Sequence, residues 1–360
     1  MEELVIRPDF WAGKRVLVTG HTGFKGSWLA LWLASMGARV SGYALPPPTT
    51  PSLWQSVQGH AGVDSTIADV RDAAALAGAL AACRPEVVFH LAAQSLVHAS
   101  YADPVGTYAT NVMGTVHLLE AARSTAGIRA VVVVTSDKCY ENRDNQQAFR
   151  ETDPLGGRDP YSNSKGCAEL VTAAYRASFF DAAAGATAVA SARAGNVIGG
   201  GDWAADRILP DIVRAAAHGE PVRVRKPQAV RPWQHVLEPL SGYLLLAERL
   251  CERPAQFAGA WNFGPDDADA VSVETIVTAV TQLWGPPAKW ARDAGAHRPE
   301  AGFLKLDSSK ARAGLAWRPR LGLQAALGWT VQWYKDQLQG ADAKALTLAQ
   351  IGRYMDLAGR

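Results

Sequence analysis

Two short groups of titratable side chains, Ser136-Asp137-Lys138 and Tyr161-x-x-x-Lys165, have the types and spacing for acid–base chemistry. Side chains four residues apart lie on one face of a helix, so Lys165 is expected beside the Tyr161 phenol. A neighbouring ammonium lowers the pKa of a phenol towards neutrality and makes it a base for a hydroxyl proton, which Ser136 can also hydrogen-bond. Asp137 and Lys138 supply a second proton donor and acceptor. The two groups together predict oxidation by a nicotinamide cofactor followed by an elimination.

The roles of Asp137 and Lys138 depend on their protonation. Asp137 is an acid only when protonated, which burial or a nearby negative charge favours. Lys138 is a base only when neutral, which requires desolvation or a cationic neighbour such as Lys165. The alternatives are a charged Lys138 that stabilises an enolate, or a solvated surface pair without a catalytic role.

A glycine-rich segment, Gly20-His21-Thr22-Gly23-Phe24-Lys25-Gly26, directly follows the apolar run 15–19. Its spacing is G-x-x-G-x-x-G, not the G-x-G-x-x-G of the standard dinucleotide fingerprint. Glycines let the backbone turn sharply, and the helix start that follows offers unpaired N–H groups to a pyrophosphate. The segment predicts a dinucleotide site formed by Gly20, Thr22, Gly23, Phe24, Lys25 and Gly26; the alternative is a plain turn before a helix.

The choice between NAD and NADP stays open on these residues. The second expected strand ends in Ser41-Gly42-Tyr43-Ala44 and lacks the carboxylate that usually binds the adenosine ribose. Lys25, inside the glycine loop, could bind the 2′-phosphate of NADP or could be a solvated loop residue.

Three further segments contain candidates for the cofactor site. Asp69 and Val70 follow the third expected strand, although Asp69 could equally cap the next helix. The small residues of Leu91-Ala92-Ala93 would let the backbone approach the cofactor closely. Asn111 lies in an expected helix, where asparagine is a poor former, so it is either exposed or has a polar task there.

Strands and helices alternate along the first half of the chain. Apolar runs without alternation suit strands that are covered on both faces, and their order predicts a doubly wound, parallel, Rossmann-like sheet. The strands are expected at 15–19, 38–44, 65–69, 86–92, 129–136 and 187–195, and the helices at 23–37, 72–82, 105–124 and 161–180.

Beyond residue 195 the loops lengthen and Gly, Pro and Trp become prominent. Helices at 206–218, 236–252 and 273–284 and short strands at 221–225 and 303–306 indicate a smaller α/β lobe. We therefore expect residues 1–195 to form the cofactor-binding lobe with the catalytic residues. Residues 196–360 should mainly bind the substrate, with some chain returning to the first lobe.

The composition excludes several classes of function. A net charge of +2 over 360 residues gives no support for nucleic-acid or membrane binding. The sequence has no apolar run that could span a bilayer and no signal-peptide pattern at its N-terminus. Cys83, Cys139, Cys167 and Cys251 have neither metal-ligand nor disulfide spacing, which favours a cytoplasmic protein with reduced thiols and no metal.

Several longer motifs resemble the CDP-glucose 4,6-dehydratases, a branch of the extended short-chain dehydrogenase/reductases that act on nucleotide sugars. The resemblance runs from about Phe10 to Met355, and the segments at 134–142 and 192–203 are its most specific parts. The motifs are TGHTGFKGSW (19–28), HLAAQSLV (90–97), TNVMGTVHLLEA (110–121), VTSDKCYEN (134–142), PYSNSKGCAEL (160–170), ARAGNVIGGGDW (192–203) and RPWQHVLEPLSGY (231–243).

The resemblance implies an NAD-dependent conversion of CDP-glucose to CDP-4-keto-6-deoxyglucose with loss of water, for deoxysugar biosynthesis. It implies that Tyr161 accepts the C4 hydroxyl proton. It also implies a nucleotide-sugar-binding second lobe and a homodimer or homotetramer. The candidates for the diphosphate are Asn196, Arg207, Arg231 and Arg298. The guanidinium groups of the three arginines match phosphate oxygens in pairs.

Other functions remain open on the sequence. A nucleotide-sugar C4-epimerase needs Tyr161 and Lys165 but no elimination pair, so Asp137-Lys138 argues against it. A dehydratase for another nucleoside diphosphate glucose fits the same residues. A non-catalytic nucleotide-binding scaffold would not need the complete Tyr161–Lys165 pair.

Overall fold

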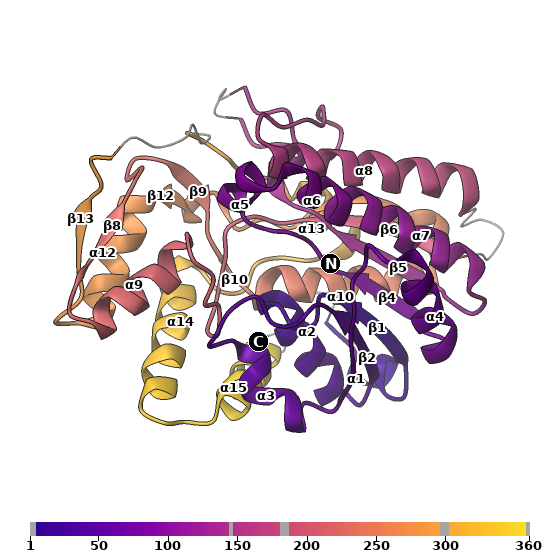
Figure 1. Cartoon of the computed structure of the whole chain (residues 1–360), viewed down its shortest axis with the longest axis horizontal. Coiled ribbons are helices and arrows are strands. Elements are labelled where there is room, and N and C mark those ends of the chain that lie inside the picture. The colour runs from indigo at the N-terminus through magenta and orange to yellow at the C-terminus, as the bar shows by residue number, and fades with distance from the viewer. Residues whose placement is uncertain (1–4, 144–146, 181–186, 296–301, 358–360) are drawn as a thin grey trace.

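The computed structural model describes residues 5–143, 147–180, 187–295 and 302–357 (Figure 1). Across these residues the main sheet has seven strands in the order β11-β6-β5-β4-β1-β2-β3, and every neighbouring pair is parallel. The predicted doubly wound Rossmann-like sheet is thus confirmed. Its strands are β1 Arg15–Thr19, β2 Arg39–Ala44, β3 Val63–Ile67, β4 Val87–His90, β5 Ala130–Val134, β6 Ala188–Arg193 and β11 Gly259–Asn262.

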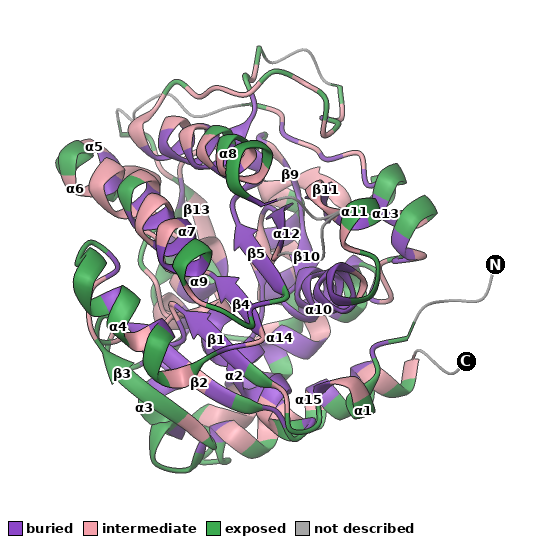
Figure 2. Cartoon of the chain, turned by 90° about the vertical axis from the view of Figure 1, so that its right-hand side faces the viewer, coloured by how far each residue is buried: buried purple, intermediate pink, exposed green. Residues whose placement is uncertain are grey.

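Helices cover both faces of this sheet, because alternate residues of its central strands point into two different cores (Figure 2). Val16 and Val132 face the first core, together with α2 (Phe24–Ser35) and α10 (Leu237–Glu252). Leu17 and Val131 face the second core, with α4 (Ala73–Cys83) and α7 (Gly114–Ser124). The unbroken apolar runs of the sequence follow from this two-sided burial.

A second group of elements lies beside the carboxyl-terminal edge of the sheet (Figure 1). Its helices bury a separate apolar core between them. Two-stranded pairs complete it, with β13 on β8, β12 on β9 and β10 on β7. The elements are β7 Val197–Ile198, α9 Ile208–Ala217, β8 Pro221–Val224, β9 Val230–Pro232, β10 Gln234–His235, β12 Ala270–Ser272, α12 Val273–Trp284, β13 Lys289–Arg292 and α14 Leu323–Leu338.

The remaining helices are short or peripheral, apart from α8, which carries Tyr161 and Lys165. They are α1 Pro8–Trp11, α3 Leu53–Val57, α5 Val97–Ala102, α6 Pro104–Tyr108, α8 Pro160–Phe179, α11 Pro254–Phe257, α13 Ser309–Leu315 and α15 Ala343–Asp356, with 3₁₀ turns at Gln58–His60, Asp137–Cys139 and Asp267–Asp269. In the part of the chain that the structure describes, no helix combines the length and apolarity needed to cross a bilayer.

Two sequence expectations are wrong in detail. Residues 303–306 form no strand. Phe303 makes one isolated bridge to Val230 and Leu306 makes one to Phe149, so the segment pairs with two different partners and extends with neither. The helix expected at 105–124 is interrupted by a π-helical turn at Ala109–Met113. Such turns often occur at functional sites, and this one contains Asn111.

Candidate active site

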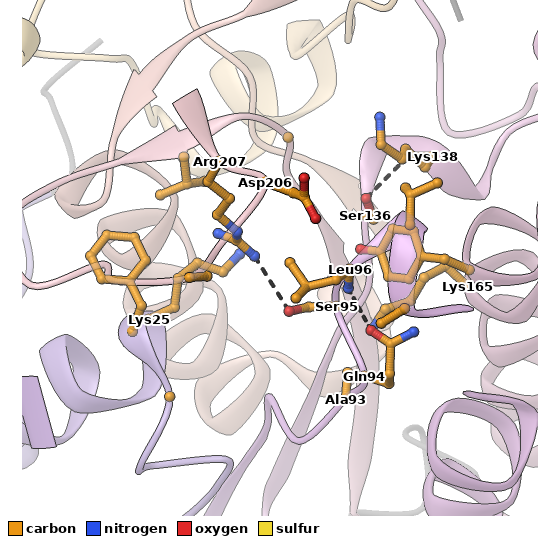
Figure 3. Close-up of a pocket in the computed structure, with 18 of the residues that line it drawn as sticks. Lys25, Ala93, Gln94, Ser95, Leu96, Ser136, Lys138, Lys165, Asp206 and Arg207 are labelled. Carbon is orange, nitrogen blue, oxygen red and sulfur yellow. Dashed lines mark hydrogen bonds between the residues drawn. The ribbon is translucent and has the colours of Figure 1, made fainter. Parts of the chain in front are cut away.

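A cavity of about 1680 Å³ opens at the carboxyl ends of β1, β4 and β5, between the sheet and the second group of elements. This is where open parallel sheets bind their ligands. The volume exceeds that of a usual small-ligand pocket, so the cavity has room for two nucleotide-containing ligands. Figure 3 shows Lys25 and Arg207 on one side of the pocket and Ser136, Lys138 and Lys165 on the other.

The glycine loop packs tightly against its surroundings, which brings the start of α2 to the cavity. Gly20 has a φ of +77°, and a Cβ there would lie 2.7 Å from the backbone nitrogen of Ala92. A Cβ on Gly26 would lie 2.0 Å from the carbonyl oxygen of Gly20. A side chain at either position would therefore push the loop away from β4 or from α2. All the predicted loop residues, Gly20, Thr22, Gly23, Phe24, Lys25 and Gly26, line the cavity.

The end of β2 differs from the usual ribose site. The ring of His21 occupies the space above Gly42, where a Cβ would lie 2.4 Å from His21 Cγ. His21 Nε2 makes a hydrogen bond of 2.7 Å with Ser65 Oγ. Burial lowers the pKa of His21 to about 4, so this ring is neutral at pH 7.

Asp69 and Val70 line the cavity, as do Leu91, Ala92 and Ala93. The Asp69 carboxylate accepts two bonds from the Arg71 guanidinium, which holds the Asp69 pKa below its usual range. The alternative helix-cap role is wrong for Asp69, because Asp72 caps α4 by accepting from the Ala75 N–H.

Asn111 lies behind the wall of the cavity and does not line it. Its Oδ1 accepts from the Gln94 N–H at 2.8 Å, and its Nδ2 donates to the Gln94 carbonyl at 3.0 Å and to Ser164 Oγ at 2.8 Å. The side chain thus joins the backbone after β4 to α8. It is buried, so the exposed alternative is wrong.

Ser136 and Asp137 lie at the end of β5, where Ser136 caps the 3₁₀ turn that follows. Ser136 Oγ accepts from the Lys138 N–H at 3.2 Å and donates to Asp137 Oδ1 at 2.9 Å. Asp137 is buried, and its Oδ2 makes no hydrogen bond with any described residue. A Cβ on Gly195 would lie 1.8 Å from that oxygen, so only a glycine leaves room for the carboxyl. Asp137 is therefore not a solvated surface residue.

Tyr161 and Lys165 are both buried on the same face of α8, close to the end of β5. Lys165 Nζ donates to the Val134 carbonyl at 3.3 Å. Burial raises the pKa of Tyr161 to about 12, and a hydrogen bond with Ser136 acts in the opposite direction. The expected lowering of the phenol pKa is therefore wrong for the protein alone, because desolvation outweighs the favourable neighbours.

Lys25 is not the solvated loop residue that the sequence left as an alternative. Lys25 lines the cavity, and its Nζ donates to the hydroxyl of the buried Tyr243 at 3.2 Å. Burial, together with the charges of Lys165 and Arg207, lowers the pKa of Lys25 to about 7. Sequence reasoning missed Tyr243, which lies on α10 far along the chain.

Three of the four diphosphate candidates, Asn196, Arg207 and Arg231, line the cavity. Arg207 donates to Asp202 Oδ2 and to Ser95 Oγ, each at 3.3 Å, and so reaches from the second group of elements to the first. Arg231 is 5% exposed and donates to the Val230 carbonyl. Arg298 lies outside the described residues.

A further arginine that lines the cavity, Arg225, was not predicted. Arg225 Nη1 donates to Asp206 Oδ1 at 2.9 Å and lies 3.0 Å from His98 Nε2. Asp206 has a φ of +61°. No sequence signal identified this contact, because its three members come from separate segments: His98 from α5, Asp206 from the turn before α9, and Arg225 from the end of β8. Within the described residues, no group of His, Cys, Asp and Glu could hold a metal ion.

The comparisons with known proteins agree with this geometry. The family model described as GDP-mannose 4,6 dehydratase matches residues 17–328. A CDP-glucose 4,6-dehydratase of Salmonella typhimurium is 53% identical over 359 residues, which are 99% of this chain and 100% of that protein.

Two solved structures share the fold. MoeE5 in complex with UDP-glucuronic acid and NAD has 27% identity and a TM-score of 0.75, and the match covers 89% of this chain and 99% of that chain. The dTDP-glucose 4,6-dehydratase DesIV of Streptomyces venezuelae has 24% identity and a TM-score of 0.78, with 92% of this chain and 99% of that chain covered.

Proposed function

The chain belongs to the family described as GDP-mannose 4,6 dehydratase, and from this premise we propose that it is a CDP-glucose 4,6-dehydratase. It would convert CDP-glucose to CDP-4-keto-6-deoxyglucose and water, a step in deoxysugar biosynthesis. One observation carries the proposal beyond the family: Asp137 and Lys138 line the same cavity as Tyr161 and Lys165. The 53% identity to a CDP-glucose 4,6-dehydratase supports the choice of nucleotide.

The cofactor in this proposal is NAD. The fit rests on the glycine loop, where neither Gly20 nor Gly26 tolerates a Cβ, and on the start of α2, which faces the cavity. Bound NAD would accept a hydride from the substrate and later return it. Asp69, Val70, Leu91, Ala92 and Ala93 would form the adenosine side of the site, and Asn111 would support its backbone.

Oxidation at C4 would use the Ser136–Tyr161 pair. Ser136 Oγ would orient the C4 hydroxyl, and the Tyr161 phenolate would accept its proton as the C4 hydride leaves. Lys165, whose pKa burial lowers to about 8, would carry the positive charge that stabilises the phenolate. The C4 ketone then acidifies the C5 hydrogen.

Elimination would use the Asp137–Lys138 pair. Lys138 would accept the C5 proton, and Asp137 would donate a proton to the departing C6 hydroxyl, which leaves as water. Asp137 lines the cavity, and its Oδ2 atom has no hydrogen-bond partner among the described residues. The hydride would return to C6 and a proton to C5, so the cycle would consume no cofactor.

The second lobe, residues 196–360, would mainly bind the nucleotide sugar, while residues 1–195 would bind NAD and carry the catalytic groups. Asn196, Arg207 and Arg231 line the cavity and would hold the diphosphate, together with Arg298. The proposed compartment is the cytoplasm, where the free cysteines stay reduced.

The proposal includes a homodimer or homotetramer. Large apolar side chains are exposed on neighbouring helices of one layer: Val105 at 77% on α6, Met113 at 46%, and Leu170 and Phe179 at 58% and 53% on α8. Such a patch is typical of a surface that another subunit covers. Sedimentation velocity would measure the assembly.

A product assay with a panel of nucleotide glucoses tests the function. The expected result is a 4-keto-6-deoxy product from CDP-glucose, seen as absorbance that develops in alkali, and a much lower rate with the dTDP, UDP and GDP sugars. Deuterium placed at C4 should appear at C6 of the same molecule. A C4-epimerised sugar would instead identify an epimerase, and no turnover of any sugar would support the scaffold alternative.

A further inference from the structure

A fully buried carboxylate lies directly behind the catalytic groups. Glu169 is 3% exposed and lies on α8, four residues after Lys165 and therefore on the same face of the helix. Its Oε1 accepts a short hydrogen bond from Thr135 Oγ1, and its Oε2 accepts from Ser191 Oγ at 2.7 Å. Thr135 is the residue immediately before Ser136. One carboxylate thus joins the helix of Tyr161 and Lys165 to the strand end of Ser136 and Asp137.

The charge of Glu169 is balanced by Arg193, which is also 3% exposed. Arg193 Nη2 donates to Glu169 Oε2 at 2.7 Å, and Arg193 Nη1 donates to the Tyr140 hydroxyl at 2.7 Å. Tyr140 in turn donates to Asn262 Oδ1 at 2.7 Å. The network therefore fixes β5, β6, β11, α8 and the chain after the catalytic turn relative to one another.

Such a buried ion pair is weak evidence for stability, because desolvation of both charges offsets their attraction. A role in positioning the catalytic groups explains the buried Glu169–Arg193 ion pair better than a contribution to stability does. Thr135 and Ser191 both donate to Glu169, so one side chain on α8 orients the end of β5 and the strand β6.

The charge of Glu169 acts on Lys165, and also on Cys139, Arg176 and Arg193. Cys139 in the catalytic turn also acts on the pKa of Lys165. The charge of Lys165 in turn acts on the pKa values of His90 on β4 and Lys25 on α2. Burial lowers the pKa of Lys165 to about 8, while Glu169 and Cys139 act to raise it. Removal of the carboxylate would leave the desolvation uncompensated, so Lys165 would lose its proton at a lower pH.

We propose that Glu169 is a positioning residue of the active site, which holds Thr135 and the adjoining Ser136-Asp137 against α8. The inference rests on the proposed function, because the positioned groups are those of the proposed reaction. Glu169 itself does not line the cavity, so it acts through Thr135 and Lys165.

The first test removes the Thr135 contact without disturbing the ion pair. Thr135→Val should lower kcat by about tenfold or more, with KM for the nucleotide sugar within about twofold, because the groups are misplaced but the binding residues are intact. Thr135→Ser keeps the donor and should restore most of kcat. Thr172→Val is the matched control: Thr172 is buried on the same helix but donates only to the Ala168 carbonyl, so kcat should not change.

The second test uses the charge. Glu169→Gln keeps an acceptor for Arg193 and should move the alkaline limb of the kcat/KM profile to lower pH by about one unit, whereas Thr135→Val should leave the limb in place. A variant with a merely structural defect would lose activity equally at all pH values. Thermal unfolding shows whether Glu169→Gln still folds, and if it does not, the Thr135 series decides the inference alone.

Failure of this inference is distinct from failure of the function. If the wild-type protein turns over no nucleotide sugar, the proposed function is wrong. If the wild type is active and Thr135→Val has an unchanged kcat, or Thr135→Ser does not restore it, the positioning role is wrong. An unmoved alkaline limb in folded Glu169→Gln would refute the effect on Lys165.

Discussion

The Ser136–Tyr161 and Asp137–Lys138 pairs line one cavity, and Lys138 is the residue that separates the elimination from the oxidation. The Lys138 backbone N–H, rather than its ammonium, makes the hydrogen bond to Ser136 Oγ. Its side chain is therefore available to a substrate and can be removed without loss of the turn. Lys138 has two proposed roles, as a neutral base or as a charged group that stabilises an enolate. An arginine in its place could fill the second role but not the first.

Lys138→Ala should lower product formation by about 10²-fold or more, while C4 oxidation, seen as NADH absorbance in a single turnover, persists. Lys138→Arg retains the charge but cannot act as a base at pH 7, so it should be as inactive as Lys138→Ala if Lys138 is the base. Recovery of turnover in Lys138→Arg would favour the charge role, and full activity of Lys138→Ala would exclude both. Exposed Arg143→Ala is the control and should behave as the wild type.

Tyr161→Phe should slow the first hydride transfer by about 10²-fold or more, because phenylalanine cannot accept the hydroxyl proton. The phenol is buried, and burial raises its pKa to about 12 in the protein alone. The wild-type rate of NADH formation should therefore rise with pH, and the variant should lose that dependence. Stopped-flow absorbance measures both, and undiminished NADH formation in the variant would contradict the role.

At the scale of elements, three consecutive glycines hold the loop after β7 between segments from both halves of the chain. A Cβ on Gly199 would lie 3.0 Å from the Phe24 ring, and one on Gly201 would lie 2.9 Å from Leu53 Cβ. A Cβ on Gly200 would lie 2.0 Å from the ring of Trp333 on α14. Helix α14 therefore sets the position of the loop that leads from Asn196 to Arg207.

Gly200→Ala should reduce stability by about 1–3 kcal/mol, because the methyl group overlaps the Trp333 ring and forces the loop or α14 to shift. The shift should also raise KM for the nucleotide sugar. Gly328→Ala on α14 is the matched control: nothing lies within 4 Å of its Cβ, so the change should stabilise the helix by about 0.5–1 kcal/mol. Urea unfolding measures the stability and steady-state kinetics measure KM. An unchanged KM in Gly200→Ala would show that the position of α14 does not affect substrate binding by the loop.

The sequence was most informative where local signals suffice. The run RVLVT coincides with β1, and the glycine loop, Ser136-Asp137-Lys138 and Tyr161–Lys165 meet in one cavity because parallel strands end at the same edge. Contacts between distant segments had no local signal. Lys25 with Tyr243, Arg225 with His98, and Gly200 with Trp333 depend on how the second half returns to the first. Glu169 could have been found, since it lies four residues after Lys165.

In the whole molecule, the last helix, α15, is attached to α10 through the buried carboxyl group of Glu238. Glu238 on α10 accepts from the Tyr354 hydroxyl of α15 at 2.7 Å and from the backbone N–H groups of Arg320 and Leu321 at 3.0 and 2.7 Å. The ring of Tyr354 also meets Trp32 of α2 edge to face. The C-terminal segment thus completes the core that begins with the glycine-loop helix.

Burial raises the pKa of Glu238 from its ordinary value of 4.5 to about 7. A carboxyl whose pKa is higher in the folded state binds its proton more tightly there, so its contribution to stability is full below pH 4.5 and is lost as the pH rises to about 7. The loss should be on the order of 3 kcal/mol in the free energy of unfolding, and it should be constant above that pH.

Glu238→Gln removes this titration while it keeps an acceptor for Tyr354, so its stability should fall less than that of the wild type between pH 5 and pH 8. Urea unfolding at several pH values measures the difference. Glu120→Gln, at an exposed carboxylate on α7, is the control and should follow the wild-type curve. If the Glu238→Gln and wild-type curves run parallel, Glu238 does not titrate in this window, and the attachment of α15 is independent of pH.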